Sequence, residues 1–161
     1  MNSVVLSMAA ITIALACGAP VRSAAPLRLS ELERDTVDAV NRERELHGRP
    51  PLRVSSTLTR IARAHSAYQA EVGKSGHRGK NGSLPADRAD AGGVAWSALA
   101  ENVALTLGYS DPVATAVRGW MKSAPHRKNI LNPVFERTGV GIATAEDGTI
   151  YFTQMFLVPP N

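Results

Sequence analysis

The hydrophobic pattern changes its period along the chain, and this change limits the folds available to it. From residue 32 to residue 72, apolar side chains recur every three or four positions, as on one face of an amphipathic helix. The last part is β-rich: residues 139–144 and 149–156 flank Glu146-Asp147-Gly148, which predicts a hairpin. Residues 101–107 are a candidate third strand. We therefore predict an α+β fold, with helices packed on a small, mainly antiparallel sheet.

Local signals indicate where the helices begin and end. Ser30 followed three residues later by Glu33 predicts a capping box at the start of the first helix. Asp111 before a proline predicts another helix start, because its carboxylate can accept from a backbone amide of the first turn. The remaining signals predict a stop at Gly48, a helix from Ser55 or Ser56 to Gly73, a short helix over Pro85–Ala91, and at most a short turn from Pro125 to Leu131.

An apolar run near the N-terminus, residues 4–16, is too short to cross a membrane, which takes about 20 residues. Its length and the small residues after it are typical of a secretory signal, and we predict cleavage after Ser23. We therefore expect a secreted, extracellular protein without a transmembrane span. The predicted organisation is a signal peptide over residues 1–23, a short linker over 24–31 and one domain over 32–158.

The chain contains a single cysteine, Cys17, which excludes an intramolecular disulfide and a multi-cysteine zinc site. Its place beside the leader leaves a lipid anchor or a periplasmic location as alternatives to secretion. The 18 Lys and Arg residues alternate with 14 Asp and Glu along most of the chain, and aromatic residues make up 5%. A charge pattern of this kind with few aromatics argues against nucleic-acid binding. We expect a monomer with no nucleic-acid partner.

Histidines and one glutamate are the candidates for chemistry. His47 lies at the end of the first expected helix, and we predict that it is a surface residue. His65 lies on an apolar helix face, and we predict that it is a hydrogen-bonded core residue. His77 and His126 lie in polar, irregular segments where packing does not need an imidazole, and Glu101 opens the candidate third strand. These three side chains could bind a divalent metal or transfer protons. Their wide spacing is no local ligand signature, so the sequence alone leaves both roles and a purely structural one open.

A series of short motifs, in order, resembles the bacterial branch of the CAP superfamily. This superfamily comprises the cysteine-rich secretory proteins, antigen 5 and the pathogenesis-related class 1 proteins, and its domain is also called SCP. The resemblance extends from about Leu32 to Phe156. The residues that carry it are Asn41-Arg42-Glu43-Arg44, Ala62-Arg63-Ala64-His65-Ser66, Gly76-His77, Arg88, Glu101-Asn102-Val103-Ala104, Trp120 to Leu131 with its Ser123-Ala124-Pro125-His126 core, Gly139-Val140-Gly141 and Phe152-Thr153-Gln154-Met155-Phe156.

The resemblance implies an α-β-α sandwich with a large cleft. It also implies that His77, Glu101 and His126 are metal ligands for zinc or another divalent cation. Ser123 stands where the eukaryotic pattern has a second glutamate, so we expect the ion to be held weakly. Ser123 and Asn102 are predicted to lie in the cleft beside the three.

The resemblance also guides the functional expectation. We expect a non-catalytic binding module rather than an enzyme, because a binding cleft tolerates Ser123, whereas a water-activating metal site needs firm ligands and a base. The predicted partner is a small amphipathic, lipid-like or cell-envelope ligand. One alternative is a hydrolase that uses a metal, or Glu101 as base and a histidine as acid. Another is a host- or wall-interaction protein that acts through its outer surface.

Overall fold

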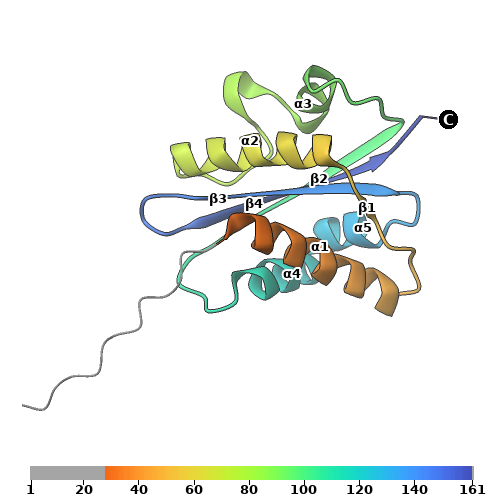
Figure 1. Ribbon diagram of the computed structural model, residues 1–161, viewed down its shortest axis with the longest axis horizontal. Coiled ribbons are helices and arrows are strands. Elements are labelled where there is room, and N and C mark those ends of the chain that lie inside the picture. Colours follow the sequence, from red (N-terminus) through yellow and green to blue (C-terminus); the bar gives the residue numbers. More distant parts are fainter. Residues whose placement is uncertain (1–27, 161) are drawn as a thin grey trace, which may run out of the picture.

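The computed structural model describes residues 28–160, and the predicted signal peptide lies outside this range. Within the range, a four-stranded sheet lies between two layers of helices. Helices α2 and α3 cover one face, and α1, α4 and α5 cover the other (Figure 1). The elements are α1 (Leu29–Leu46), β1 (Arg53–Val54), α2 (Ser56–Val72), a 3-10 turn (Lys80–Gly82), α3 (Pro85–Ala91), β2 (Ala98–Thr106), α4 (Pro112–Lys122), α5 (Ala124–Leu131), β3 (Arg137–Thr144) and β4 (Ile150–Val158).

The sheet has the order β1-β3-β4-β2. Strands β3 and β4 form the predicted hairpin, and its turn is closed by a hydrogen bond of 2.8 Å from the Ala145 N–H to the Thr149 carbonyl. The candidate third strand is β2, antiparallel to β4. The short parallel strand β1 was not predicted. These findings confirm the α+β sandwich with a mainly antiparallel sheet. No helix of this part of the chain is long and apolar enough to span a membrane.

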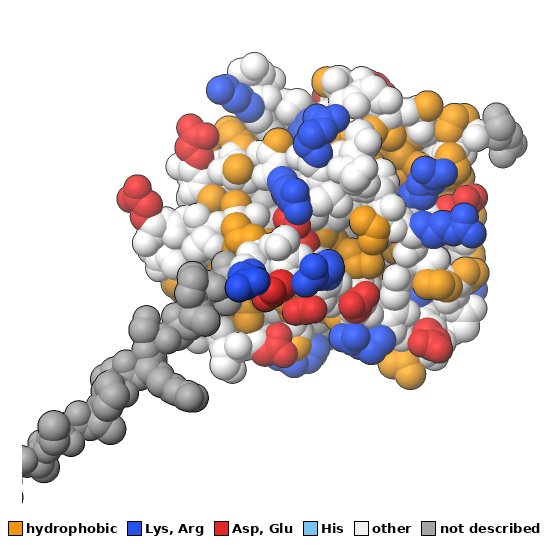
Figure 2. Space-filling view, viewed as in Figure 1, with side chains coloured by type: hydrophobic (Ala, Val, Ile, Leu, Met, Phe, Trp, Pro, Cys, Tyr) orange, Lys and Arg blue, Asp and Glu red, His pale blue; other side chains and the backbone are white. Residues whose placement is uncertain are grey.

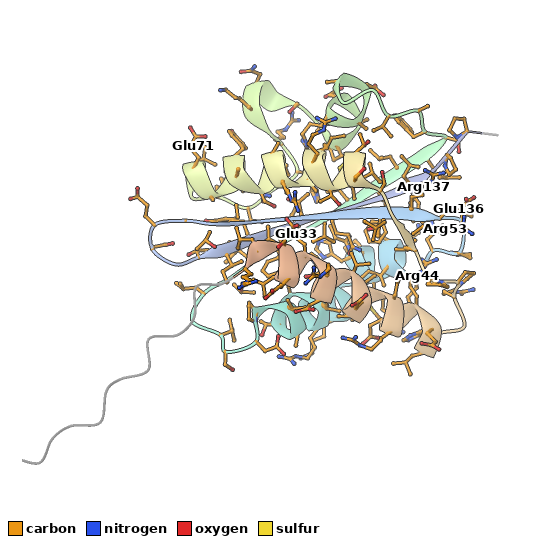
Figure 3. All side chains as sticks on the ribbon, viewed as in Figure 1. Glu33, Arg44, Arg53, Glu71, Glu136 and Arg137 are labelled. Atoms are coloured by element: carbon orange, nitrogen blue, oxygen red, sulfur yellow. The ribbon has the colours of Figure 1, made fainter. Side chains whose placement is uncertain are left out.

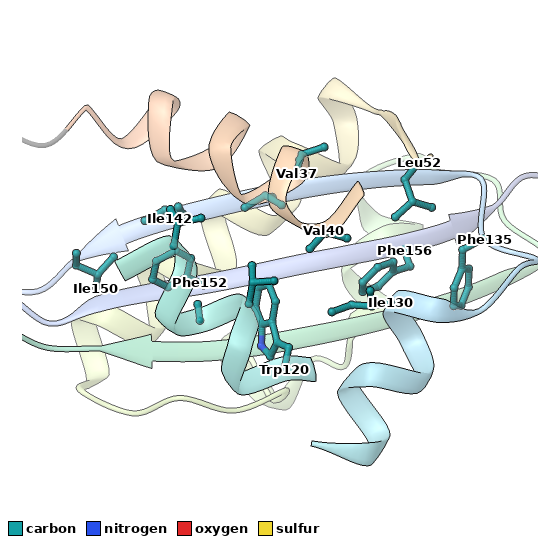
Figure 4. Packing of buried hydrophobic residues seen from close by; sticks show 14 residues of the cluster. Val37, Val40, Leu52, Trp120, Ile130, Phe135, Ile142, Ile150, Phe152 and Phe156 are labelled. Carbon is teal, nitrogen blue, oxygen red and sulfur yellow. The ribbon is translucent and has the colours of Figure 1, made fainter. Parts of the chain in front are cut away.

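The face under α1, α4 and α5 holds a core of large apolar side chains (Figure 4). Trp120, Phe152 and Phe156 are at most 1% exposed. The indole N–H of Trp120 donates to the Val103 carbonyl at 2.9 Å, so its polar atom is satisfied inside the core. Burying a large apolar side chain contributes about 1.5–3 kcal/mol, so this core adds substantially to the stability of the fold.

The opposite face is packed differently, because the backbone of α2 lies almost directly on β3. A Cβ atom on Gly141 would lie 2.0 Å from the Arg63 amide nitrogen, and one on Gly139 would lie 2.3 Å from that of Thr59. Only glycine fits at such distances. Buried polar groups lie between the two elements: the Ser66 hydroxyl donates to the Gly141 carbonyl at 2.8 Å. This close contact fixes α2, which carries residues of the site.

The start of α1 differs from the prediction. The helix begins at Leu29, and no side chain caps its N-terminus, so the capping box of Ser30 and Glu33 is wrong. The Glu33 carboxylate instead accepts from the Arg63 side chain at 2.8 Å and from the Ile142 N–H at 3.3 Å. Figure 3 shows Glu33 lying between α1 and α2. A tertiary ion pair has therefore replaced the expected local contact.

A small cavity of about 270 Å³ lies beside this ion pair, between α1 and α2. Its lining includes Val37, Val54 and Val140 as well as Arg34. On this face of the molecule, hydrophobic side chains lie among charged ones (Figure 2). The outer edge of β3 beyond β1 faces this region, because β1 pairs only with the first two residues of β3.

The other helix signals were more reliable. Ser55 caps α2 by accepting from the Leu58 amide at 3.4 Å, and Asp111 caps α4 by accepting from the Ala114 amide at 2.8 Å. The short helix α3 has its predicted limits. The segment predicted as at most a short turn from Pro125 to Leu131 is a helix of eight residues, α5, which begins at Ala124 and ends at Leu131 as expected. Pro125 lies in the first turn, where the missing N–H is not needed.

Candidate functional site

Glu101 is a buried carboxylate on β2, with a side chain that is 1% exposed. Its Oε2 accepts from Nη2 of Arg88 on α3 at 2.6 Å, and its Oε1 accepts from Nδ1 of His77 at 3.0 Å. His65, on α2, lies with its Nε2 at 3.9 Å from the same Oε1. The carboxylate is therefore enclosed by one guanidinium and two imidazoles. Charge-assisted contacts of this kind are shorter and stronger than neutral hydrogen bonds.

The loop that carries His77 is held by side chains from two helices. The Gly76 N–H donates to Oε1 of Gln69 at 3.0 Å, and the Gly76 carbonyl accepts from His65 Nε2 at 2.8 Å. The His77 carbonyl accepts from Arg88 Nη1 at 3.0 Å. His77 thus lies on an irregular segment whose backbone is nevertheless fixed, which is how a loop can position a ligand-binding side chain.

His126 reaches the same strand from the other side. It lies at the start of α5, and its Nδ1 is 2.8 Å from the Ser123 hydroxyl. Asn102, the residue after Glu101, is fully buried and donates to the His126 carbonyl at 3.1 Å. Asn129 donates in turn to Asn102 at 2.9 Å. Asn102 therefore joins β2 to α5 and holds the backbone of His126.

The three buried or half-buried histidines titrate in different directions. The hydrogen bond to Glu101 raises the pKa of His77, and its charge adds to this effect, although burial opposes it. Burial, with a smaller effect from the His77 charge, lowers the pKa of His126. Burial also lowers the pKa of His65, against the attraction of Glu101. Of these three histidines, His77 is thus the one whose pKa is shifted towards the protonated form, whereas the pKa values of His65 and His126 are shifted towards the neutral form.

Each predicted site residue has a definite place in the structure. His77 and Glu101 are in direct contact, and Ser123 contacts His126. Asn102 donates a hydrogen bond to the His126 carbonyl. His47 is on the surface, as predicted, with a ring nitrogen 2.8 Å from the Glu43 carbonyl. His65 is a buried, hydrogen-bonded residue, as predicted. The sequence analysis gave no role to two further residues that hold the site together, Arg88 and Gln69. A sequence shows the polar character of these residues but not which backbone groups of the neighbouring loop they reach.

The candidate metal ligands His77, Glu101 and His126 are not arranged to hold a resident metal ion. Both oxygens of Glu101 already accept hydrogen bonds, one of them from the cationic Arg88. Among residues 28–160, no group of three or more His, Cys, Asp or Glu side chains is placed to hold a metal. The expected weakly held zinc or other divalent cation at His77, Glu101 and His126 stays a prediction.

A cavity of about 320 Å³ lies beside His77. Tyr68 and Val72, from the last turns of α2, give it an apolar and aromatic wall, whereas Lys74 and Arg78 place cations at its rim. No Asp or Glu of the described residues lines it. Cavities of this size that combine apolar walls with a few polar groups are typical of small-molecule sites.

A larger cavity lies away from these residues, with a volume of about 760 Å³ between the end of α2 and the turn that joins β3 and β4. Its charged residues are Glu71, Glu146 and Asp147, and none of the predicted site residues lines it. An acidic rim of this kind attracts cations weakly but does not by itself form a ligand site.

Residues 37–156 match the CAP family, described as the cysteine-rich secretory protein family. The chain is a member of this family. It is 36% identical over 135 residues to the uncharacterized protein YkwD of Bacillus subtilis, a match that covers 84% of this chain and 50% of YkwD. The uncharacterized membrane protein YlbC of the same organism is 32% identical over 125 residues, or 78% of this chain and 34% of YlbC. The chain thus spans half or less of the length of these relatives.

Solved structures show the same fold. An extracellular protein containing a SCP domain from Bacillus anthracis superposes with a TM-score of 0.71 at 26% identity, over 84% of this chain and 45% of the other. An outer surface protein of Borrelia burgdorferi superposes with a TM-score of 0.75 at 16% identity, over 83% and 97% of the two chains. The expected CAP sandwich is thereby confirmed, and the second likeness concerns the fold alone.

Proposed function

We propose that this CAP domain is exported and acts as a non-catalytic binding module for a small amphipathic ligand of the cell envelope. The cavity beside His77 carries the proposal, because it offers an apolar wall to a chain or ring and a cationic rim to an anionic or polar head group. Export is supported by the predicted leader and by the similar protein of Bacillus anthracis, which is described as extracellular.

The state of Glu101 supports binding over catalysis. A general base must lie within hydrogen-bond reach of the proton that it takes from the substrate. Both oxygens of this carboxylate are held, by Arg88 and by His77, inside a site where its side chain is 1% exposed. In this arrangement Glu101 orients His77 and anchors α3 to β2, and His77 is left to contact a ligand with the outer part of its ring.

A titration of the mature chain with lysophosphatidylglycerol, a single-chain anionic phospholipid, tests the proposal. Isothermal titration calorimetry below the micelle concentration is expected to show saturable binding. The double variant Lys74→Ala and Arg78→Ala should weaken it about tenfold, since two cations at the rim would be lost. Arg53→Ala, which removes an exposed cation outside the cavity, is the matched control and should bind as the native chain does.

The remaining outcomes separate the possibilities. Equal affinity for glycerol 3-phosphate, which has the head group without the chain, would show that the apolar wall has no part in binding. No saturable binding of either probe, or equal weakening by Arg53→Ala, would contradict the proposal.

A hydrolase is the second candidate, and one observation favours it. The pKa values of His77 and His126 move in opposite directions, and such pairs serve as acid and base in many enzymes. Turnover of an ester, peptide or glycan substrate that falls at least a hundredfold in Glu101→Gln would establish this function and overturn the binding module.

A further inference from the structure

Arg88 is the cation of the candidate site. Its side chain is 12% exposed and enters from α3. One guanidinium nitrogen, Nη2, donates to Glu101 at 2.6 Å, while Nη1 donates to the carbonyls of Ser83 at 2.8 Å and His77 at 3.0 Å. A single side chain therefore binds the carboxylate of the site, the loop that carries His77, and the turn that precedes α3.

The turn around Arg88 has the shape that this side chain needs. The Gly79 N–H donates to the Ser83 carbonyl at 2.8 Å, which closes the turn. A Cβ on Gly79 would lie 2.8 Å from the Ser83 hydroxyl and 3.2 Å from Arg88 Nη1. Any larger residue at this position would thus press on the guanidinium. The turn is therefore packed closely around the guanidinium of Arg88 on the side of Gly79.

The charges of Glu101 and Arg88 also disfavour a metal ion at this site. The buried carboxylate of Glu101 and the largely buried guanidinium of Arg88 are at hydrogen-bond distance and neutralise each other. A divalent cation on Glu101 would have to displace Nη2 or share the carboxylate with it, a few ångströms from a permanent positive charge. Arginine does not lose its proton at any pH that the fold survives, so it cannot make way by deprotonation.

We infer that Arg88 occupies the carboxylate of Glu101 and so prevents this carboxylate from binding a metal ion. The domain therefore functions without zinc and gains a zinc site only when Arg88 is removed. The inference stands whether or not the cavity beside His77 binds an amphiphile. It replaces the weakly held ion expected from the resemblance with a side chain of the protein itself.

Zinc binding to native protein and variants tests this inference, with calorimetric affinity and melting temperature as readouts. The native chain should bind Zn²⁺ no tighter than about 1 mM at His77, Glu101 and His126. Arg88→Met should melt lower, because Glu101 loses its counter-charge, and Zn²⁺ should raise its melting temperature and bind at least about tenfold tighter than to the native chain. Arg88→Lys keeps the positive charge and should gain no zinc affinity.

The double variant Arg88→Met with Glu101→Gln tests whether the carboxylate of Glu101 is the zinc ligand that Arg88→Met releases. It should melt above Arg88→Met alone and should not respond to Zn²⁺, since no unpaired charge is left. Micromolar zinc binding by the native chain that Glu101→Gln removes would overturn the inference, as would a folded Arg88→Met variant without any gain. If Arg88→Met does not fold even with Zn²⁺, the native chain and Arg88→Lys decide: zinc binding by either overturns the inference, and its absence in both supports it.

Discussion

Two glutamates of this protein are buried against arginines, and the two ion pairs differ in how far the arginine is withdrawn from water. In the pair of Glu33 with Arg63, the glutamate side chain is 7% exposed but the arginine side chain is 54% exposed. In the pair of Glu101 with Arg88, the values are 1% and 12%. The first pair joins α1 to α2, and its arginine is exposed to solvent. The second pair is enclosed between β2 and α3.

Their neighbours differ as well. Glu33 accepts from the Ile142 amide and so satisfies the outer edge of β3, which is a structural task. Glu101 accepts from His77, with His65 close by, next to a cavity of ligand size. Two carboxylates in similar ion pairs can thus have different roles. The groups around the pair, rather than the pair itself, distinguish a candidate ligand site from a structural ion pair.

Removing the charge of each glutamate should give the largest difference between the pairs. Glu101→Gln is expected to lower the free energy of unfolding by about 3 kcal/mol, because Arg88 stays charged and buried without a counter-charge. Glu33→Gln should lower it by about 1 kcal/mol, because Arg63 can turn to water. Urea unfolding followed by circular dichroism measures both, and equal losses would contradict the distinction.

The structural task of Glu33 can be measured at a single amide. In Glu33→Ala the Ile142 N–H loses its acceptor, and its hydrogen exchange should become about tenfold faster relative to the amides that pair β3 with β4. Glu33→Gln keeps a side-chain oxygen and is the matched control, with a smaller change expected. Unchanged exchange at Ile142 in Glu33→Ala would mean that the carboxylate does not cap the strand edge.

The smallest effect expected is a pH dependence confined to the Glu101 pair. Because its pKa is raised in the folded state, His77 contributes stability that is fully present below about pH 6.5 and is lost as the pH rises through the raised pKa. The difference in unfolding free energy between the native chain and His77→Asn should therefore be largest near pH 6, below about 1 kcal/mol, and shrink towards pH 9. For Arg63→Met, which contacts no histidine in the described residues, the corresponding difference should not vary over this range.

The elements that depend on local chemistry could be predicted from the sequence. The caps at Ser55 and Asp111 and the hairpin of β3 and β4 involve residues that are close in the chain, and their signals were correct. The capping box at Glu33 failed because its carboxylate pairs with a residue 30 positions further along. The two-residue strand β1 was missed for the same reason, since its parallel partner lies far away in sequence.

The candidate site shows the same division. His77 and Glu101 stood out because their segments gave no packing reason for such side chains, and they are in contact. The part played by Arg88 could not be read from the sequence, because an arginine on a short polar helix is ordinarily a solvated residue. Its acceptors lie on the loop before α3, at His77 and Ser83, and on β2, at Glu101, and no short sequence motif indicates that one guanidinium reaches all three.

The glycines under α2 determine more than a packing distance. Because Gly139 and Gly141 leave space for the helix backbone only at matching positions, α2 cannot slide along β3 or turn about its own axis without a clash. His65 and Gln69, further along the same helix, therefore point at the His77 loop from a fixed angle. One residue inserted between Arg63 and His65 would swing both by about 100° and detach the loop, however well the helix itself refolded.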